Sequence, residues 1–373
     1  GGGSKRDFTG DALAKPQRLA VSCGGAHGAR QFLREDGQRG IGSQDKNMRH
    51  EWRNLVRGND VASAPEAILI AGPTASGKSA LAVALAQRHG GLVINADSMQ
   101  VYRELRIITA RPGRQEEAAA PHRLFGIVSA GSRFSAGRWL KAAEGAMEEA
   151  RKDGLIPIFA GGTGLYFKIL TEGIADVPDV PDKLVDDWRG EMARVGPQML
   201  HDILARRDPE MAALLAPGDG QRIIRALSVL EASGRSLLDF QRLQAGPAPL
   251  ALHRCRALFL EPERGWLHQR IHRRFDEMIA EGALGEVAAL KALDLDPSLP
   301  AMRAHGVPAL LAHLNGEMTL EDAIVRAKTD TRRYAKRQRT WFRTQMAGWE
   351  SLETGPETAA EELLAAAGQR LSA

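Results

Sequence analysis

Short apolar runs alternate with amphipathic stretches through the middle of the chain. The run at 67–71, Ala-Ile-Leu-Ile-Ala, is apolar throughout and is followed at once by Gly72 and Pro73, which is typical of a buried parallel strand that ends in a turn. A helix is predicted over 78–89, where apolar residues recur on one side, and a second strand over 92–95. These segments form a strand, a loop, a helix and a second strand.

The same alternation returns further along the chain. The pattern predicts a helix over 136–151, a strand over 156–160, a helix after Gly164 and a strand over 255–260. Strands that alternate with helices form parallel sheets, because each helix returns the chain to the same end of the sheet. We therefore predict an α/β fold with a parallel sheet flanked by helices.

Three segments depart from this alternation. Residues 1–64 are rich in Gly, Arg, Gln and Asp and lack hydrophobic periodicity, which favours a mostly disordered basic extension over a nucleic-acid-binding arm or a targeting peptide. Residues 178–216 are helical and polar in pattern and predict a helical insertion, while the stretch after 264 predicts successive C-terminal helices. The α/β core is then expected over 65–177 and 217–373.

Composition narrows the function classes. The chain of 373 residues is 43% hydrophobic, enough for a sizeable core, and its net charge of +4 is only weak support for a polyanionic partner. Cys23 and Cys255 are far apart, which argues against a disulfide scaffold, a zinc finger or an iron–sulfur site. No apolar run approaches the roughly 18 residues of a membrane span. We expect a cytoplasmic protein without membrane contact.

A phosphate-binding motif lies between the first strand and the first helix. The segment 72–79 matches G-x-x-x-x-G-K-[ST], in the context that this motif requires. Its glycines let backbone N–H groups face a diphosphate, the lysine adds a full positive charge, and the final hydroxyl can bind Mg²⁺. The predicted diphosphate-binding residues are Gly72, Pro73, Thr74, Ala75, Ser76, Gly77, Lys78 and Ser79, with Ser79 as the metal ligand.

The motif alone does not specify which diphosphate is bound. A nucleoside triphosphate is the default, so an ATP-binding small-molecule kinase is one hypothesis and an RNA-binding NTPase is another. A kinase should have an arginine-bearing lid and no long basic helix, whereas an NTPase should have an apolar strand that ends in an Asp. The strand at 156–160 continues into Gly161 and Gly162 instead.

A long basic helix is predicted near the C-terminus. Thr319 can cap a helix that continues to about Gln345, and the stretch 331–346 contains six basic residues and no acidic one. A spacing of 4, 3 and 4 places four bases on one stripe, which favours phosphate contacts with RNA over a merely solvated face. The stripe comprises Arg332, Lys336, Arg339 and Arg343, with Arg333 and Arg337 beside it.

Five blocks, taken together, resemble the tRNA dimethylallyltransferase family. They lie in the family's order at 94–103 (Ile-Asn-Ala-Asp-Ser-Met-Gln-Val-Tyr-Arg), 108–112, 161–166, 219–227 and 332–343. The resemblance implies a P-loop NTPase-like fold and transfer of a dimethylallyl group from dimethylallyl diphosphate to N6 of the adenosine 3′ to the tRNA anticodon. It also implies Mg²⁺ as cofactor and the tRNA anticodon loop as partner; we expect a monomer.

The resemblance also implies roles for individual residues. Asp97 matches the family's general base, although without the resemblance a turn-forming or helix-capping Asp is an equal alternative. Thr163 would position the diphosphate and act with Lys78 in catalysis, and it could also cap the following helix. Arg222 and Arg225 would reach a diphosphate or RNA. The implied tRNA-binding residues are Asp97, Ser98, Met99, Gln100, Gln221, Arg222, Ile223, Ile224, Arg225, Arg332, Arg333, Lys336, Arg337 and Arg339.

The sequence departs from the family pattern in three places. Residues 121–126 replace a His-His-x-Ile-Asp stretch, Phe134-Ser135 replaces a Tyr-Ser element, and residues 306–309 replace Gly-Tyr-Lys-Glu. The phosphate motif and Asp97 are intact. The departures therefore concern contacts with tRNA rather than the expected chemistry.

Overall fold

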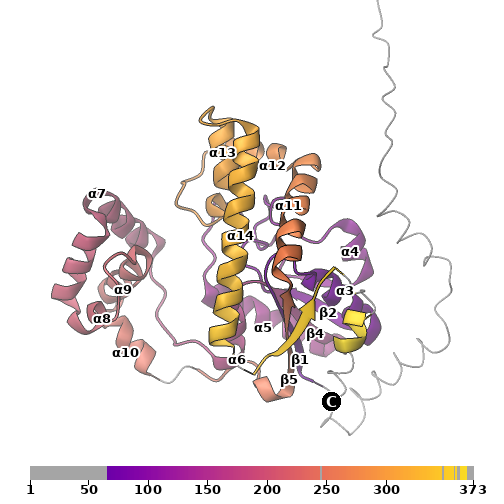
Figure 1. Cartoon of the computed structure of the whole chain (residues 1–373). Helices are drawn as coiled ribbons and strands as arrows, with labels where there is room; N and C mark the ends of the chain where they lie inside the picture. Colours follow the sequence, from indigo (N-terminus) through magenta and orange to yellow (C-terminus); the bar gives the residue numbers. More distant parts are fainter. Residues whose placement is uncertain (1–64, 244–245, 347, 357, 359–361, 368–373) are drawn as a thin grey trace, which may run out of the picture. The chain divides into compact units, whose positions relative to one another are not determined.

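A six-stranded parallel sheet forms the centre of the computed structural model, which describes residues 65–243, 246–346, 348–356, 358 and 362–367 (Figure 1). The expected extension at 1–64 lies outside the described residues. The strand order is β3-β2-β4-β1-β5-β6. The strands are β1 (Ala67–Ala71), β2 (Gly91–Asn95), β3 (His122–Arg123), β4 (Ile156–Gly161), β5 (Cys255–Pro262) and β6 (Glu350–Thr354).

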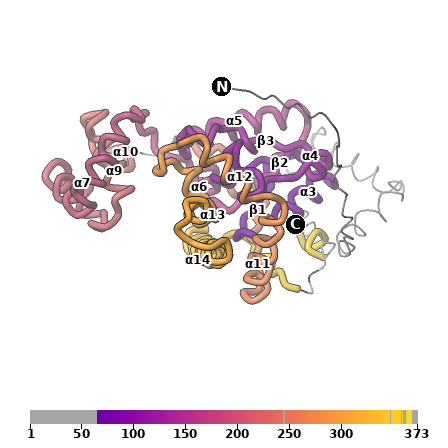
Figure 2. Tube along the Cα trace, turned by 90° about the horizontal axis from the view of Figure 1, so that it is seen from above, coloured from indigo at the N-terminus to yellow at the C-terminus, as the bar shows by residue number. Residues whose placement is uncertain are grey.

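Helices cover both faces of the sheet, because the central strands are apolar on both sides. All five residues of β1 are buried. Leu69 packs with one hydrophobic cluster, together with residues of the helices that follow β3, β4 and β5, whereas Ile68 and Ile70 pack with a second cluster around the helix after β1. The flanking helices are α3 (Lys78–His89), α4 (Arg114–Ala119), α5 (Ala136–Asp153) and α6 (Gly164–Glu172), and α3 and α6 lie on opposite sides of β1 (Figure 2).

The strand order brings three loops together at one edge of the sheet. Strand β4 lies between β1 and β2, with Ile70 opposite Ala160 on one side and Asn95 opposite the same Ala160 on the other. Because the strands are parallel, their carboxyl ends lie on the same side of the sheet, where ligands bind in open α/β sheets. The loops after β1, β2 and β4 therefore meet there.

Four helices between β4 and β5 share a separate core. They are α7 (Asp182–Arg207), α8 (Pro209–Ala213), α9 (Gly220–Ser233) and α10 (Leu237–Arg242), and a short 3-10 helix η2 (Leu252–Arg254) leads into β5. Leu200 and Leu204 of α7 pack with Ile223 and Leu227 of α9. The helical cluster thus continues beyond residue 216, where the sequence predicted a return to the α/β core.

Successive helices follow β5, as the sequence predicted. They are α11 (Arg264–Ala280), α12 (Ala283–Lys291), η3 (Ala301–Arg303), α13 (Val307–Leu314) and α14 (Leu320–Gln345). The Thr319 hydroxyl accepts a hydrogen bond from the N–H of Asp322 at 3.1 Å, which confirms the predicted cap of α14. Phe342, near the end of α14, packs on Phe259 of β5 with ring centroids 5.2 Å apart and anchors the helix on the sheet.

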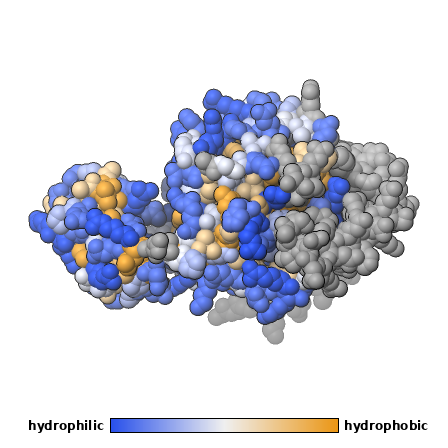
Figure 3. All heavy atoms as spheres, turned by 90° about the horizontal axis from the view of Figure 1, so that it is seen from below, coloured by the Kyte–Doolittle hydropathy of each residue, from blue (hydrophilic) through white to orange (hydrophobic). Residues whose placement is uncertain are grey.

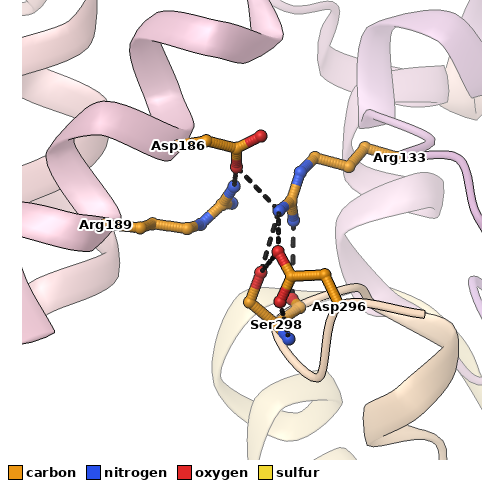
Figure 4. Close-up of polar contacts among 5 residues, drawn as sticks. All are labelled: Arg133, Asp186, Arg189, Asp296 and Ser298. Atoms are coloured by element: carbon orange, nitrogen blue, oxygen red, sulfur yellow. Dashed lines mark hydrogen bonds and ion pairs between the residues drawn. The ribbon is translucent and has the colours of Figure 1, made fainter. Parts of the chain in front are cut away.

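Arg133 lies in the loop between β3 and α5 and contacts both the helical cluster and a second loop of the α/β core (Figure 4). Its Nη2 lies 2.9 Å from Asp186 Oδ1 on α7 and also 2.9 Å from the hydroxyl of Ser298, in the loop between α12 and η3. Arg189 contacts the same Asp186 oxygen at 2.9 Å. Since Asp186 is half exposed, each pair contributes at most about 1 kcal/mol.

On the face seen in Figure 3, the coloured surface is mostly hydrophilic, with small apolar patches. Exposed large side chains such as Leu214, Leu243 and Val325 belong to different helices or loops rather than to one face. In this part of the chain no helix has both the length and the apolar character needed to cross a bilayer.

Candidate active site

The phosphate loop curls between β1 and α3 as its motif predicts. Gly77 adopts φ of 98°, a left-handed conformation that glycine tolerates without steric cost. The N–H of Ser76 donates to the carbonyl of Pro73 at 3.2 Å, and Arg270 of α11 donates to the carbonyl of Ala75 at 2.9 Å. These contacts hold the loop above the N-terminus of α3, where backbone N–H groups and the helix dipole favour an anion.

Lys78 carries the positive charge of the phosphate-binding motif. Its Nζ donates to the carbonyl of Pro73 at 3.2 Å. Burial lowers the pKa of Lys78 to about 8, the negative charge of Asp97 opposes this shift, and the positive charge of Arg274 adds to it. The ammonium is therefore poorly solvated, so a diphosphate would stabilise its charged form.

Asp97 lies just beyond β2 and is held by a network from Asn95. The fully buried Asn95 side chain accepts a hydrogen bond from the Asp97 N–H at 2.8 Å and donates to the Asp97 carbonyl at 2.9 Å. Asp97 Oδ1 accepts the N–H of Met99 at 2.9 Å. No hydrogen bond to Oδ2 occurs among the described residues, so one oxygen forms the turn and the other can accept a proton.

Thr163 contacts the Asp97 loop rather than capping a helix. It occupies the N-cap position of α6, but its side chain makes no capping hydrogen bond. Its Oγ1 instead accepts the N–H of Ser98 at 2.9 Å and lies 3.2 Å from the Ser98 hydroxyl. Thr163 therefore stands at the predicted N-cap position, but its hydroxyl is used on the Ser98 segment instead of capping α6.

A largely apolar cavity of about 70 Å³ lies between the phosphate loop and Asp97. Its apolar wall is formed by Ile108, Ile271, Phe275 and Met278. A cavity of this kind suits a short hydrocarbon group attached to a phosphate. Its other lining residues are Thr74, Ala75, Asp97, Met99, Thr109, Ala110, Arg274, Ala304, His305, Thr331 and Tyr334.

The Gln100 side chain has an internal role. Its Nε2 donates to the carbonyls of Thr109 and Ala110 at 2.9 and 3.0 Å. Both amide N–H donors are therefore used within the protein, and only Oε1 remains for a nucleobase. This hydrogen bonding joins the Asp97 loop to the segment that lines the cavity.

A basic groove of about 1010 Å³ lies between α11 and α14. All four bases of the predicted stripe line it, together with Arg333, whereas Arg337 stacks over Tyr334 at 5.8 Å and does not line it. Burial and the nearby Arg264 lower the pKa of His268, so the charge of the groove comes from lysine and arginine. The lining residues are Arg264, Leu267, His268, Thr329, Arg332, Arg333, Ala335, Lys336, Arg339, Thr340, Arg343 and Thr344.

Comparison with known families decides the classification. Residues 100–345 match the model described as IPP transferase, and residues 65–127 match the model described as isopentenyl transferase. The chain belongs to the IPP transferase family.

Other IPP transferases resemble this chain in sequence and in fold. It is 56% identical over 300 residues to the tRNA dimethylallyltransferase of Nitrobacter hamburgensis. The aligned region covers 80% of this chain and 94% of that protein. The tRNA isopentenylpyrophosphate transferase of Bacillus halodurans superposes with a TM-score of 0.59 at 31% identity, over 82% of this chain and 96% of that one. A eukaryotic dimethylallyltransferase acting on tRNA gives a TM-score of 0.68 at 29% identity, over 79% and 76%. The P-loop NTPase-like fold is thereby confirmed.

In this IPP transferase the predicted site residues on α9 lie outside the cavity beside the phosphate loop. Arg222 and Arg225 are exposed on α9 in the helical cluster, and neither lines the cavity beside the phosphate loop. Ile223 and Ile224 are 0% and 4% exposed in the core of that cluster. The apolar side chains of the two isoleucines are thus used in packing, whereas Gln221 on the same helix is exposed. A role of this segment in tRNA binding stays a prediction.

Two residues of the site were missed by the sequence analysis. Arg274 lines the cavity with Asp97, and burial lowers its pKa, with Arg270 adding to the shift and Glu116 and Asp97 opposing it. Gln338 lies buried between the phosphate loop and the loop after β4. The only signal for Gln338 was a neutral amide within a run of bases.

Proposed function

We propose that this protein transfers the dimethylallyl group of dimethylallyl diphosphate to N6 of the adenosine 3′ to the tRNA anticodon and releases diphosphate. The observation that supports this best is the cavity shared by the phosphate loop and Asp97, because it places an anion site, an apolar pocket and a carboxylate together. The names of the relatives agree with this reaction. The kinase and NTPase alternatives are not favoured.

Lys78 and the loop amides would act on the leaving group. As the allylic C–O bond stretches, negative charge accumulates on the diphosphate, so donors that face it stabilise the transition state more than the ground state. Arg274 lines the cavity beside the phosphate loop and would supply a second positive charge there. The diphosphate then leaves with the electron pair of the broken bond.

Asp97 would accept the proton. An adenine amine is too weak an acid to lose its proton first, but it becomes strongly acidic once the C–N bond begins to form. The Asp97 carboxylate then takes that proton, and Thr163 holds the neighbouring Ser98 in place. The products are N6-prenylated adenosine and diphosphate.

Mg²⁺ would bind at Ser79 together with the diphosphate. Among the described residues no group of three or more His, Cys, Asp or Glu side chains could hold a metal ion. Mg²⁺ commonly uses one or two protein ligands and completes its shell with phosphate oxygens and water. The Ser79 hydroxyl at the end of the motif would supply such a ligand, and the ion would neutralise charge on the diphosphate.

The basic groove would hold the tRNA, and Lys336→Ala tests it. Lys336 is exposed in the groove, so its removal should weaken tRNA binding and lower the slope of log K against log salt by about 0.7–0.9, while the rate at saturating tRNA stays unchanged. Binding titrations between low and moderate salt measure this. Lys152→Ala removes another exposed base, from α5, and should leave the slope unchanged.

The activity itself is tested with Mg²⁺, labelled dimethylallyl diphosphate and unmodified tRNA that has adenosine 3′ to the anticodon. We expect label in the tRNA at N6 of that nucleotide, and none when guanosine replaces it. Turnover of ATP without transfer of label would contradict the proposed function and favour a kinase or NTPase.

A further inference from the structure

One buried polar side chain interrupts the basic, exposed surface of α14. Gln338 is 5% exposed, whereas Lys336 and Arg337 beside it are exposed. A buried amide costs free energy unless both its oxygen and its nitrogen find hydrogen-bonding partners. The partners of Gln338 therefore decide whether it only fills space or links other parts of the site.

The two ends of the Gln338 amide contact two different loops. Oε1 accepts the N–H of Thr74 in the phosphate loop at 3.0 Å, and Nε2 donates to the carbonyl of Gly162 at 2.8 Å. A backbone N–H needs an acceptor and a carbonyl needs a donor, so these partners fix the orientation of the amide. Gln338 thus joins the loop after β1 to the loop after β4.

The loop after β4 packs closely against α14. A Cβ at Gly162 would overlap Gln338 Nε2, and a Cβ at Gly164 would overlap the ring of Trp341, three residues further along α14. Glycine at both positions allows the backbone to approach the helix. This contact leaves the loop little freedom to shift relative to Gln338.

The connection continues to the carboxylate. Thr163, in the same loop, accepts the N–H of Ser98 at 2.9 Å, and Ser98 directly follows Asp97. Hydrogen bonds therefore run from the phosphate loop through Gln338 and the Thr163 loop to the segment that holds Asp97. The leaving-group site and the proton acceptor lie at the two ends of this chain.

We propose that Gln338 is a positioning residue for prenyl transfer, which sets the separation between the diphosphate on the phosphate loop and the amine beside Asp97. The proposal rests on the proposed function. Attack on the allylic carbon requires the amine, the carbon and the leaving oxygen to be aligned, and a misplacement of about 1 Å can reduce a rate by about 10²-fold. Because Gln338 belongs to α14, it also joins the basic groove to the phosphate loop.

Gln338→Met tests this, because methionine keeps the length of the side chain and removes both hydrogen bonds. We expect the single-turnover rate of transfer to fall by about 10- to 10²-fold with the Kd for tRNA unchanged. More of the donor should also be lost to water. In that reaction the C–O bond to diphosphate breaks, a water oxygen forms the new bond and releases its proton to solvent. The ratio of dimethylallyl alcohol to prenylated tRNA should therefore rise.

Gln345→Met is the matched control, since Gln345 is exposed near the end of α14 and accepts a hydrogen bond only from Lys168 among the described residues. It should leave rate and product ratio at wild-type values. An unchanged ratio in Gln338→Met, with a rate loss that follows only its Tm, would overturn the proposal in favour of a structural role. A wild-type protein that transfers no label would overturn the proposed function, and this proposal with it.

Discussion

Asp97→Asn is expected to reduce the single-turnover rate of prenyl transfer by about 10²- to 10⁴-fold, the usual contribution of a general base. Asparagine cannot accept the amine proton, but its side-chain oxygen can still accept the N–H of Met99 that Asp97 Oδ1 accepts at 2.9 Å. The local turn is therefore retained while the base is lost. Rapid-quench measurement with saturating donor and tRNA isolates the chemical step.

Asp97→Ala separates the two roles of this side chain. It removes both the base and the turn hydrogen bond, so it should lose as much rate as Asp97→Asn and additionally lower Tm. The Tm of Asp97→Asn should lie above that of Asp97→Ala, because the turn hydrogen bond is retained. A rate for Asp97→Asn close to that of the wild type would assign proton transfer to another group.

Lys78→Met should lower kcat/KM for dimethylallyl diphosphate by about 10²- to 10³-fold, comparable to the loss of one preorganised donor from an oxyanion site. Lys78 is the first residue of α3, and its positive charge compensates the negative charge that develops on the leaving group. Methionine keeps the apolar part of the side chain and removes the ammonium. Initial rates across donor concentrations measure the effect.

The pH dependence of kcat/KM for the donor gives a second test of the role of Lys78. Because burial lowers the pKa of this lysine to about 8, the ammonium is present below pH 8 and is lost above it. The value of kcat/KM for the donor, which reports groups of the free enzyme, should therefore fall as pH rises through about 8. In Lys78→Arg the charge persists at higher pH, so this fall should move upward. An unmoved fall would assign it to another group.

The local signals in the sequence were sufficient for the elements around the site. Strand β1 and helix α3 have the predicted bounds, because an apolar run, a glycine-rich turn and an amphipathic repeat follow one another without ambiguity. Strand β6 was missed. Only Leu352 and Thr354 of its five residues are buried, and its pairing with β5 depends on a segment almost a hundred residues earlier.

The parts of the site that sequence could not give depend on tertiary packing. Arg274 and Gln338 belong to helices that approach the phosphate loop only after the C-terminal helices pack on the sheet, so no local pattern distinguishes them from exposed neighbours. At Ile223 and Ile224 the motif and the local pattern point to different roles. A motif placed them among tRNA contacts, although their apolar side chains alone favour a core position.

The two edges of the sheet also bear on self-association. An exposed edge strand offers unpaired backbone groups to which another chain can add a strand, and the risk rises with its length and apolar character. Strand β3 at one edge has only two residues, and β6 at the other edge presents the exposed acidic residues Glu350 and Glu353. Short length at one edge and negative charge at the other thus protect the folded sheet from edge-to-edge aggregation.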